Sequence, residues 1–256
     1  MAVDFNSLKN DIVSWIKNYA VTNNIESLII GVSGGIDSSV VSTLCALTKL
    51  PTYVILLPIH QEEKQLALSE LHTEWLKSNF RNVTKIKLDL TELFDVFNKI
   101  FITSFNNELA FANSRSRFRM VSLYQIATSR NGIVVGTGNK IEDFAIGFFT
   151  KYGDGGVDIS PIADLLKSEV YQIAKILGIK EEIISIPPTD GLWGDSRSDE
   201  EQIGASYDEL EWALNFQGDT THLTEREKKV LSIYYSFNKR NRHKIMPIPV
   251  FKKTKN

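Results

Sequence analysis

The run SGGIDSS at Ser33–Ser39 has the residue types and the position of a phosphate-binding turn. It follows the apolar run Leu28–Val32 and leads directly into a segment with helical spacing. Two adjacent glycines let the backbone approach a phosphate without a Cβ in the way, and a helix start offers free N–H groups and a positive dipole end to an anion. The run lacks the lysine of GxxxxGKS/T and the third glycine of GxGxxG, so it fits neither of those phosphate loops.

Asp37 is the unusual member of this run, because a carboxylate repels a phosphate unless a cation lies between them. We therefore interpret Asp37 as a ligand of Mg²⁺, which proteins commonly hold with one or two carboxylates together with substrate phosphates. The alternative is an ordinary helix N-cap, where Asp and Ser are frequent. A Gly-Gly-x-Asp-Ser run between a strand and a helix favours the metal-binding interpretation.

The elements that would position these residues alternate in type along the chain. Apolar residues at helical spacing predict helices at 5–19, 37–49, 62–79, 91–105, 114–129, 166–177, 198–214 and 224–239, and short apolar runs predict strands at 28–32, 52–58, 83–88 and 132–136. Alternation of this kind indicates βαβ units, so we expect a three-layer α/β/α fold with a central, mostly parallel sheet. Ligands bind such Rossmann-like sheets at the carboxyl ends of the strands.

The composition is typical of a soluble cytoplasmic protein. Of the 256 residues, 43% are hydrophobic and 23% are charged, as in average globular proteins. The apolar runs are too short to span a bilayer, and the N-terminus shows no signal peptide. The single cysteine, Cys45, excludes an intramolecular disulfide and a cysteine-based zinc site, and we expect it to fill the core. Because the chain has no internal repeat, we predict one domain over residues 1–256.

The distribution of charge allows two interpretations. The net charge of −2 excludes a globally basic nucleic-acid binder. Residues 190–211 nevertheless carry eight acids against one base, and nine Lys and Arg with no acid follow from Lys228 to the end. The two segments are either solvated faces that partly neutralise each other, or the basic end meets a polyanionic ligand.

Ser33–Ser39 resembles the signature of the N-type ATP pyrophosphatases, which split ATP between its α and β phosphates. Further blocks along the chain, in the right order, are similar to the NAD synthetase family of that superfamily. These blocks are GTGNKIE at Gly136–Glu142, GFFTKYGDGGVD at Gly147–Asp158, Pro161 with Lys167, PTD at Pro188–Asp190, SYDE at Ser206–Glu209 and His243-Lys244. The resemblance covers nearly the whole chain and implies an adenine nucleotide alpha hydrolase-like fold.

The resemblance also implies a role for individual residues. The ATP contacts would be Gly31, Val32, Ser33, Gly34, Gly35, Ile36, Asp37, Ser38, Thr137, Lys167 and Thr189. The contacts to the second substrate would be Arg117, Lys151, Asp158, His243 and Lys244. Asp37 and Glu142 would hold Mg²⁺, and Asp37 and Lys167 would act in catalysis. Two carboxylates from different strand ends suit an octahedral, phosphate-bridging Mg²⁺, and a lysine is a compact charge suited to a phosphate.

The enzyme implied by the resemblance is an ammonia-dependent ligase. It would convert deamido-NAD (nicotinate adenine dinucleotide), ATP and ammonia into NAD, AMP and pyrophosphate through an adenylated intermediate, as the last step of NAD biosynthesis. The family implies a homodimer, and no nucleic-acid or membrane partner is expected. One alternative is another ATP pyrophosphatase that acts on tRNA, either a thiolase or a lysidine synthetase. The other is a nucleotide-binding regulatory module without turnover.

Alternatives stay open at two groups of residues. Asp143 adjoins Glu142 and could replace it on the metal, although we favour Glu142. Arg115, Arg117 and Arg119 fan apart on a helix, so at most two of them can face one ligand, and the resemblance favours Arg117.

The acidic stretch Leu192–Glu209 also has two interpretations. It is either a lid that orders over ATP and keeps water from the adenylate, or a surface loop without such a role.

Overall fold

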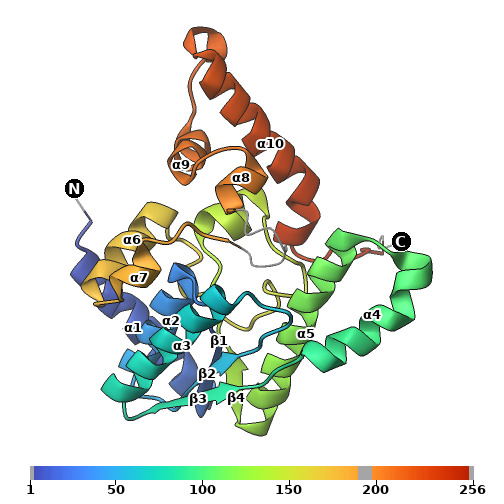
Figure 1. The fold of residues 1–256 in the computed structure, drawn as a ribbon. Coiled ribbons are helices and arrows are strands. Elements are labelled where there is room, and N and C mark those ends of the chain that lie inside the picture. Colours follow the sequence, from blue (N-terminus) through green and yellow to red (C-terminus); the bar gives the residue numbers. More distant parts are fainter. Residues whose placement is uncertain (1–2, 190–197, 254–256) are drawn as a thin grey trace.

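The computed structural model describes residues 3–189 and 198–253. At its centre lies a sheet in the order β3-β2-β1-β4, formed by β1 (Ser27–Gly31), β2 (Thr52–Leu56), β3 (Val83–Lys87) and β4 (Gly132–Val134), in which all pairings are parallel. Helices cover both faces of the sheet (Figure 1). The predicted three-layer fold is therefore confirmed, whereas the part of the predicted lid at 192–197 and Asp190 lie outside the described residues.

The helices connect the strands and also form the C-terminal part of the molecule. They are α1 (Phe5–Thr22), α2 (Ile36–Leu47), α3 (Glu63–Asn79), α4 (Thr91–Phe105), α5 (Glu108–Ser129), α6 (Lys167–Ile176), α7 (Glu181–Ile184), α8 (Asp199–Ile203), α9 (Tyr207–Asn215) and α10 (Glu225–Ile245), with a π-helix η1 (Lys140–Ile146) and a 3₁₀ turn η2 (Thr220–His222). Within the described residues, no helix combines the length and the apolar character needed to cross a bilayer.

Alternate side chains of the strands enter cores on opposite faces of the sheet, as the two-residue period of a strand requires. Leu28 and Ile30 of β1 lie in a core with α1, α2 and α6. Ile29 points the other way and packs with Leu123 and Ala127 of α5. The sheet is therefore buried on both faces, so a ligand is expected at the carboxyl ends of its strands.

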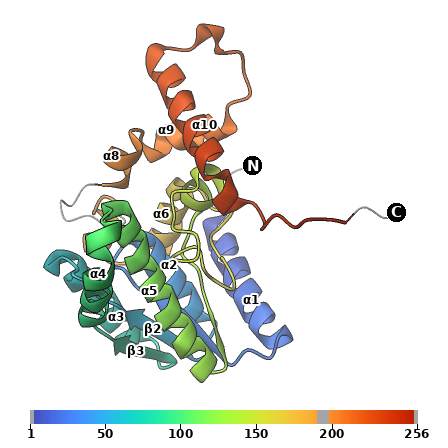
Figure 2. The ribbon, with the colours of Figure 1, turned by 90° about the vertical axis from the view of Figure 1, so that its right-hand side faces the viewer.

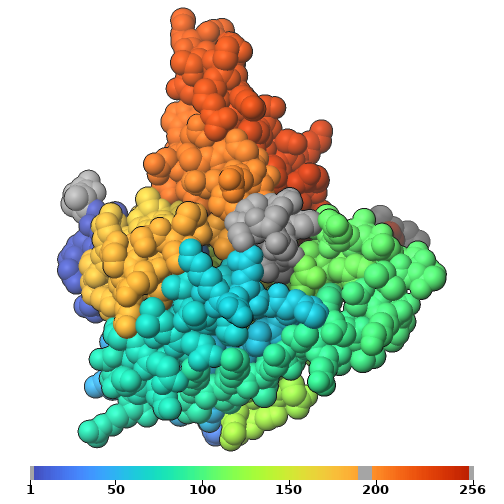
Figure 3. All heavy atoms as spheres, in the orientation of Figure 1, coloured from blue at the N-terminus to red at the C-terminus, as the bar shows by residue number. Residues whose placement is uncertain are grey.

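The C-terminal helices α8–α10 rise as a column above this edge (Figures 1, 2 and 3). They have a core of their own, which includes Leu210 of α9 and Val230 of α10 and is shared with Ile141 and Ile146 of η1. The Asn241 side chain donates to the carbonyl of Ile146 at 2.9 Å. The segment η1 thus joins the column to the sheet.

Several elements differ from the predicted pattern. The helix expected at 198–214 is divided, because Gly204 adopts a φ of +87° that ends α8, and the Ser206 side chain then caps α9. The region after β4, expected to be rich in loops, contains the π-helix η1. Helix α10 continues to Ile245, so His243 and Lys244 lie in its last turn rather than in a tail.

Other differences are small. Helix α5 begins at Glu108 instead of Ser114, because the Asn107 side chain caps it by accepting from the N–H of Ala110 at 2.9 Å. The four-residue helix α7 was not predicted. The remaining strands and helices match the predicted ranges to within a few residues.

Candidate active site

The phosphate loop, residues Val32–Ser38, leaves the carboxyl end of β1 and leads into α2. The N–H of Ser39 donates to the carbonyl of Gly35 at 3.1 Å and starts the helical hydrogen bonds. The N–H groups of the three residues between them therefore have no partner inside the helix. The hydroxyls of Ser38 and Ser39 donate to the same carbonyl at 3.0 and 2.9 Å and hold the turn together. This is the geometry of an anion site at a helix start.

Gly34 fits this loop for two reasons. Its φ is +91°, a conformation that side chains other than glycine rarely adopt. A Cβ at Gly34 would also lie 2.7 Å from the carbonyl oxygen of Gln65 and 2.9 Å from the nitrogen of Ser69. The loop thus approaches the backbone of α3 so closely that no side chain fits between them.

The side chains of Val32 and Ile36 are buried in the core, at 5% and 3% exposure. These two predicted ATP contacts could therefore be made only by their backbone atoms. Ser33 and Gly35, in contrast, are exposed at the surface of the loop. Thr137 lies half-buried in the turn that follows β4, at the same edge of the sheet.

The most buried charge near the loop is the ammonium group of Lys167, the first residue of α6, whose side chain is 1% exposed. It donates to Asp37 Oδ2 at 2.5 Å and to Glu142 Oε1 at 2.9 Å. Burial alone would lower the pKa of Lys167, but the charges of the two carboxylates outweigh it and raise the pKa above its ordinary value. Lys167 is therefore a fixed cation.

The two carboxylates that share Lys167 are not equivalent. Burial raises the pKa of Asp37, and the nearby charge of Lys167 opposes this effect. For Glu142 burial acts in the same direction, but Lys167 and the hydroxyl of Tyr207 together lower the pKa. Glu142 is thus the more firmly ionised member of the pair.

Two further residues hold these carboxylates, and sequence reasoning assigned neither of them a role. Asn139, which is fully buried, donates to Asp37 Oδ1 at 3.1 Å, and its own side-chain oxygen accepts from the N–H groups of Ile141 and Glu142. The hydroxyl of Tyr207 donates to Glu142 Oε1 at 2.5 Å. Both lie in sequence blocks that carried the resemblance, which was the available signal.

The structure distinguishes Glu142 from its neighbour Asp143. The carboxylate of Asp143 lies against Gly138, where a Cβ would come 1.8 Å from Asp143 Oδ2. Burial raises the pKa of Asp143 well above its usual value, and the charges of Asp154 and Glu142 add to this effect. Glu142, and not Asp143, is the carboxylate that meets Lys167.

The predicted Mg²⁺ can be tested against these donors. Asp37 and Glu142 are two hard oxygen donors that converge on one point, and two carboxylates with phosphate and water oxygens are a usual ligand set for Mg²⁺. They carry two negative charges against the single positive charge of Lys167. Across residues 3–189 and 198–253, no third His, Cys, Asp or Glu completes an all-protein site. The residues therefore fit Mg²⁺, which Asp37 and Glu142 would hold together with substrate oxygens.

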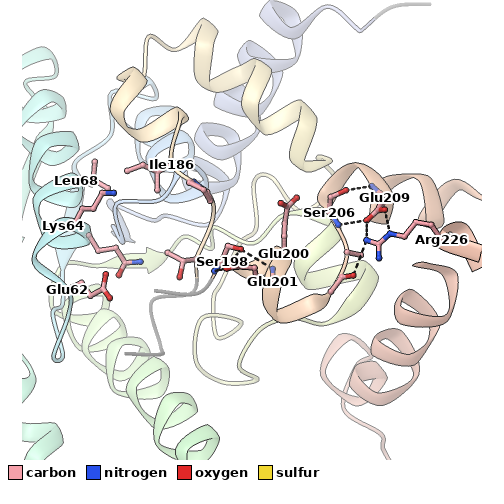
Figure 4. Close-up of a pocket in the computed structure, with 15 residues that line it drawn as sticks. Glu62, Lys64, Leu68, Ile186, Ser198, Glu200, Glu201, Ser206, Glu209 and Arg226 are labelled. Carbon is pink, nitrogen blue, oxygen red and sulfur yellow. Dashed lines mark hydrogen bonds and ion pairs between the residues drawn. The ribbon is translucent and has the colours of Figure 1, made fainter. Parts of the chain in front are cut away.

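A cavity of about 710 Å³ lies between the start of α3, the segment 186–189 and helices α8 and α9 (Figure 4). Gln65 and Leu68 line it and also contact the phosphate loop at Gly34. Thr189, a predicted ATP contact, is part of its wall. Its volume lies in the range of small-molecule sites, so it can receive a nucleoside next to the phosphate loop.

The predicted basic contacts to the second substrate gather where the segment 147–151 lies between α5 and the end of α10. Arg117 donates through Nε and Nη2 to the carbonyl of Lys151, both at 3.3 Å, and Lys151 Nζ donates to the carbonyl of His243 at 2.5 Å. Lys244 Nζ donates to the carbonyls of Gly147 and Phe149 at 2.9 and 2.8 Å. The four predicted basic residues are thus close together.

Asp158, which follows η1 in the chain, contacts α5 at Tyr124. Its carboxylate accepts from the hydroxyl of Tyr124 at 3.1 Å and from the N–H of Val134 at 2.8 Å. Tyr124 is seven residues after Arg117, two helical turns along the same face of α5. Asp158 and Arg117 can therefore flank an elongated ligand, although no contact joins them directly in the described part of the chain.

Comparison with known proteins gives consistent matches over nearly the whole chain. A family model described as NAD synthase matches residues 8–247. The NH(3)-dependent NAD(+) synthetase of Sulfurisphaera tokodaii is 31% identical over 264 residues, which cover 98% of this chain and 91% of the relative.

Solved structures agree with these matches. NMN synthetase from Francisella tularensis is 28% identical with a TM-score of 0.88, and the alignment covers 98% of this chain and 100% of that one. An NH3-dependent NAD synthetase from Campylobacter jejuni, solved in complex with the nitrate ion, is 24% identical with a TM-score of 0.79 over 98% and 100%, and it shows the shared fold. The matched residues include the phosphate loop, Glu142 and Lys167, so the chain belongs to the NAD synthase family.

Proposed function

We propose that this protein is an ammonia-dependent ligase that uses ATP to convert deamido-NAD into NAD, with release of AMP and pyrophosphate. The observation that carries the proposal is the convergence of Asp37, Glu142 and Lys167 beside an exposed phosphate loop, in a chain of the NAD synthase family. The alternative of a tRNA-directed enzyme is not favoured, because the family match extends over residues 8–247.

In the first step, a carboxylate oxygen of the nicotinate attacks the α-phosphorus of ATP, and the bond from this phosphorus to pyrophosphate breaks. The free N–H groups at the start of α2 would hold phosphate oxygens. Lys167 would neutralise negative charge that develops on the departing pyrophosphate. Mg²⁺, held by Asp37 and Glu142, would supply additional neutralisation of the phosphates.

In the second step, ammonia attacks the carbonyl carbon of the adenylate, the carbon–oxygen bond to AMP breaks, and the nitrogen loses a proton to give the amide. No covalent intermediate with the protein is needed. The side chains would contribute by orientation and by fixed charge. Arg117, Lys151, Asp158, His243 and Lys244 are proposed to bind the pyridine nucleotide, which carries a pyrophosphate and a carboxylate.

The test of this function is a product balance. The purified protein is incubated with deamido-NAD, ATP, Mg²⁺ and ammonium chloride, and NAD, AMP and pyrophosphate are measured together. We expect the three products in equal amounts. ATP cleavage to ADP, or pyrophosphate release that needs tRNA instead of deamido-NAD, would contradict the proposal.

A second candidate substrate is supported by one comparison. The NMN synthetase from Francisella tularensis has a TM-score of 0.88 over 98% of this chain and 100% of its own. Its name gives the mononucleotide NMN as the product, and amidation of deamido-NMN would be the corresponding reaction of this chain. Deamido-NMN should therefore be assayed beside deamido-NAD, and the ratio of the two kcat/KM values decides which substrate is preferred.

We also propose that two copies assemble through α4, which lies on the outside of the molecule next to α5 (Figure 1). Leu93, Val96 and Ile100 of α4 form one stripe along the helix and are 51%, 58% and 68% exposed. An apolar stripe of this size is rarely left uncovered, and α5 beside it carries Arg117. Sedimentation should give a dimer, which Ile100→Lys should dissociate; a wild-type monomer at micromolar concentration would contradict the assembly.

The cellular location and the domain count stay proposals. A single buried cysteine and an ATP-dependent reaction are in accord with a reducing cytoplasm. The core shared by η1 and α8–α10 adjoins the sheet through η1, which is in accord with one domain over residues 1–256.

A further inference from the structure

The three alternating arginines of α5 have different surroundings. Arg115 lies over the ring of Phe94, with Cζ 5.4 Å from the ring centre. Arg117, which the resemblance favours, is exposed and donates to the carbonyl of Lys151. Arg119 is half-buried and turns toward the sheet, where its Nε donates to the carbonyl of Leu57 at 3.0 Å.

The position of Arg119 can be located from its neighbours. Leu57 directly follows the last residue of β2, so Arg119 reaches the carboxyl edge of the sheet. Leu123, one turn further along α5, lies against Gly31, the last residue of β1, with Leu123 Cδ1 3.3 Å from the place of a Cβ. Farther along, the carbonyl of Arg130 accepts from Ser27 at the other end of β1. Arg119 therefore lies where β1 passes into the phosphate loop.

The guanidinium of Arg119 has donors to spare at this position. Its Nε donates to the carbonyl of Leu57, and among the described residues no carboxylate lies within ion-pair distance of its two terminal amino groups. Burial lowers the pKa of Arg119 to about 10, and the charge of Arg115 adds to this effect while Asp154 opposes it. The group remains charged at neutral pH. A partly buried cation without a counter-ion is unfavourable unless an anion joins it.

We propose that Arg119 is an anion-binding residue of the active site, and that its two terminal amino groups take a phosphate of one of the substrates. Nε on the carbonyl of Leu57 fixes the plane of the guanidinium, and a fixed guanidinium binds two oxygens of one phosphate at once. The phosphate belongs either to ATP or to the pyridine nucleotide. If the phosphate belongs to the pyridine nucleotide, the inference rests on the proposed function. If it belongs to ATP, the inference does not depend on that function.

The experiment compares Arg119→Lys and Arg119→Ala with Arg130→Lys. Arg130 is the matched control, because it caps the end of the same helix at the opposite edge of the sheet, with its guanidinium 5.4 Å from the ring of Tyr53. For each protein, the Kd of ATP with Mg²⁺ and the Kd of deamido-NAD are measured by titration calorimetry, and Tm is measured by scanning calorimetry. Neither titration requires turnover.

We expect both Arg119 variants to weaken one of the two ligands by about 10- to 100-fold, the effect of losing hydrogen bonds to a charged group. Arg119→Lys keeps the positive charge but loses the planar guanidinium that binds two phosphate oxygens at once. This variant should therefore still lose most of the affinity for that ligand. A loss in the ATP titration assigns the phosphate to ATP, and a loss in the deamido-NAD titration assigns it to the pyridine nucleotide. Arg130→Lys should bind both ligands within twofold of the wild type.

A lower Tm with both Kd values unchanged within twofold would overturn the inference, because Arg119 would then only brace α5 against β2. Unchanged affinities with an unchanged Tm would overturn it as well. Failure of the proposed function has a different signature: wild-type protein would make neither NAD nor NMN. The ATP titration would then decide on Arg119 alone.

Discussion

Lys167 is the residue on which the proposed chemistry depends most, since an ammonium that is 1% exposed needs counter-ions to remain charged. Asp37 and Glu142 provide them, and this explains why the three residues occur together although they lie far apart in the sequence. The same three charges would be redistributed when a triphosphate with Mg²⁺ enters. A single neutral substitution in the group should therefore affect catalysis far more than folding.

Asp37→Asn tests this expectation. The amide keeps the size of the side chain and leaves Glu142 as a counter-ion for Lys167. We expect pyrophosphate release in the presence of deamido-NAD to fall by about 100-fold or more, with a circular dichroism spectrum like that of the wild type. The double variant Asp37→Asn/Glu142→Gln leaves Lys167 unpaired and should lose about 3–5 kcal/mol of unfolding free energy. Near-wild-type turnover of Asp37→Asn would contradict the role.

Tyr207→Phe tests the positioning of Glu142. The change removes the hydroxyl that donates to Glu142 Oε1 at 2.5 Å and keeps the buried ring. We expect kcat to fall by about tenfold, from the loss of one hydrogen bond to a charged group, and the Mg²⁺ concentration at half-maximal rate to rise. The control is Tyr234→Phe, a buried tyrosine in the same core. If both variants show the same Mg²⁺ dependence as the wild type, Tyr207 only fills space.

How far the site could be predicted depended on the range of its contacts. The phosphate loop is local, so its glycines, serines and Asp37 were identified from adjacent residues. Asn139 caps η1 locally, but its contact to Asp37 and the contact of Tyr207 to Glu142 join residues far apart in the sequence. Nothing in the neighbourhood of either residue indicates those distant partners. For Arg119 the pattern showed that the three arginines diverge, but the packing of α5 decides which one faces the sheet.

At the scale of elements, the spacing of apolar residues predicted where helices and strands lie. It did not predict where a helix is interrupted or how far it extends. Helix α8 ends at Gly204, because this residue adopts a positive φ. The periodicity of apolar residues in the sequence carries no information about φ. The π-helix η1 depends on tertiary packing, since the side chains of Asn238 and Asn241 bind the carbonyls of Ala145 and Ile146. Helix α10 extends beyond its predicted end at Lys239 for the same reason.

Helices α2 and α3 are joined by a buried polar contact with a predictable dependence on pH. His72 Nε2 lies 2.9 Å from the hydroxyl of Ser42, and burial lowers the pKa of His72 from 6.5 to about 4. The folded state therefore favours neutral histidine, whereas the unfolded chain takes up a proton first as the pH falls. The contribution to stability is complete above pH 6.5 and is lost as the pH falls from 6.5 to about 4.

His72→Gln removes this titration. We expect wild-type protein to lose up to roughly 3 kcal/mol more unfolding free energy than His72→Gln between pH 7 and pH 4, as measured by urea titration at both pH values. The exposed His222 serves as the control, and His222→Gln should follow the wild type. An identical pH dependence for the wild type and His72→Gln would show that His72 does not contribute.

At the scale of the whole molecule, the sheet and the C-terminal column meet above the carboxyl edge (Figure 2). The sheet supplies the phosphate loop and the ion pair of Asp37 with Lys167. The column supplies Tyr207 from α9, and His243 and Lys244 from the end of α10. The predicted βαβ order could locate the first set, because parallel strands end at one edge. The second set depends on how the column is placed, which no repeat or motif indicates.

The environment of Cys45, the only cysteine in the sequence, indicates whether ammonia or glutamine supplies the nitrogen. Hydrolysis of glutamine commonly uses an activated cysteine thiolate, but Cys45 is fully buried and burial raises its pKa, so this chain has no cysteine suited to that step. We therefore expect NAD synthesis by the purified protein with ammonium chloride and none with glutamine. At a fixed total ammonium concentration the rate should climb with pH, because ammonium has no lone pair and only free ammonia can attack the adenylate.

Cys45→Ser should keep this activity while losing about 1–3 kcal/mol of unfolding free energy for a poorly paired buried hydroxyl. Glutamine-dependent synthesis by the wild type that is lost in Cys45→Ser would refute the assignment.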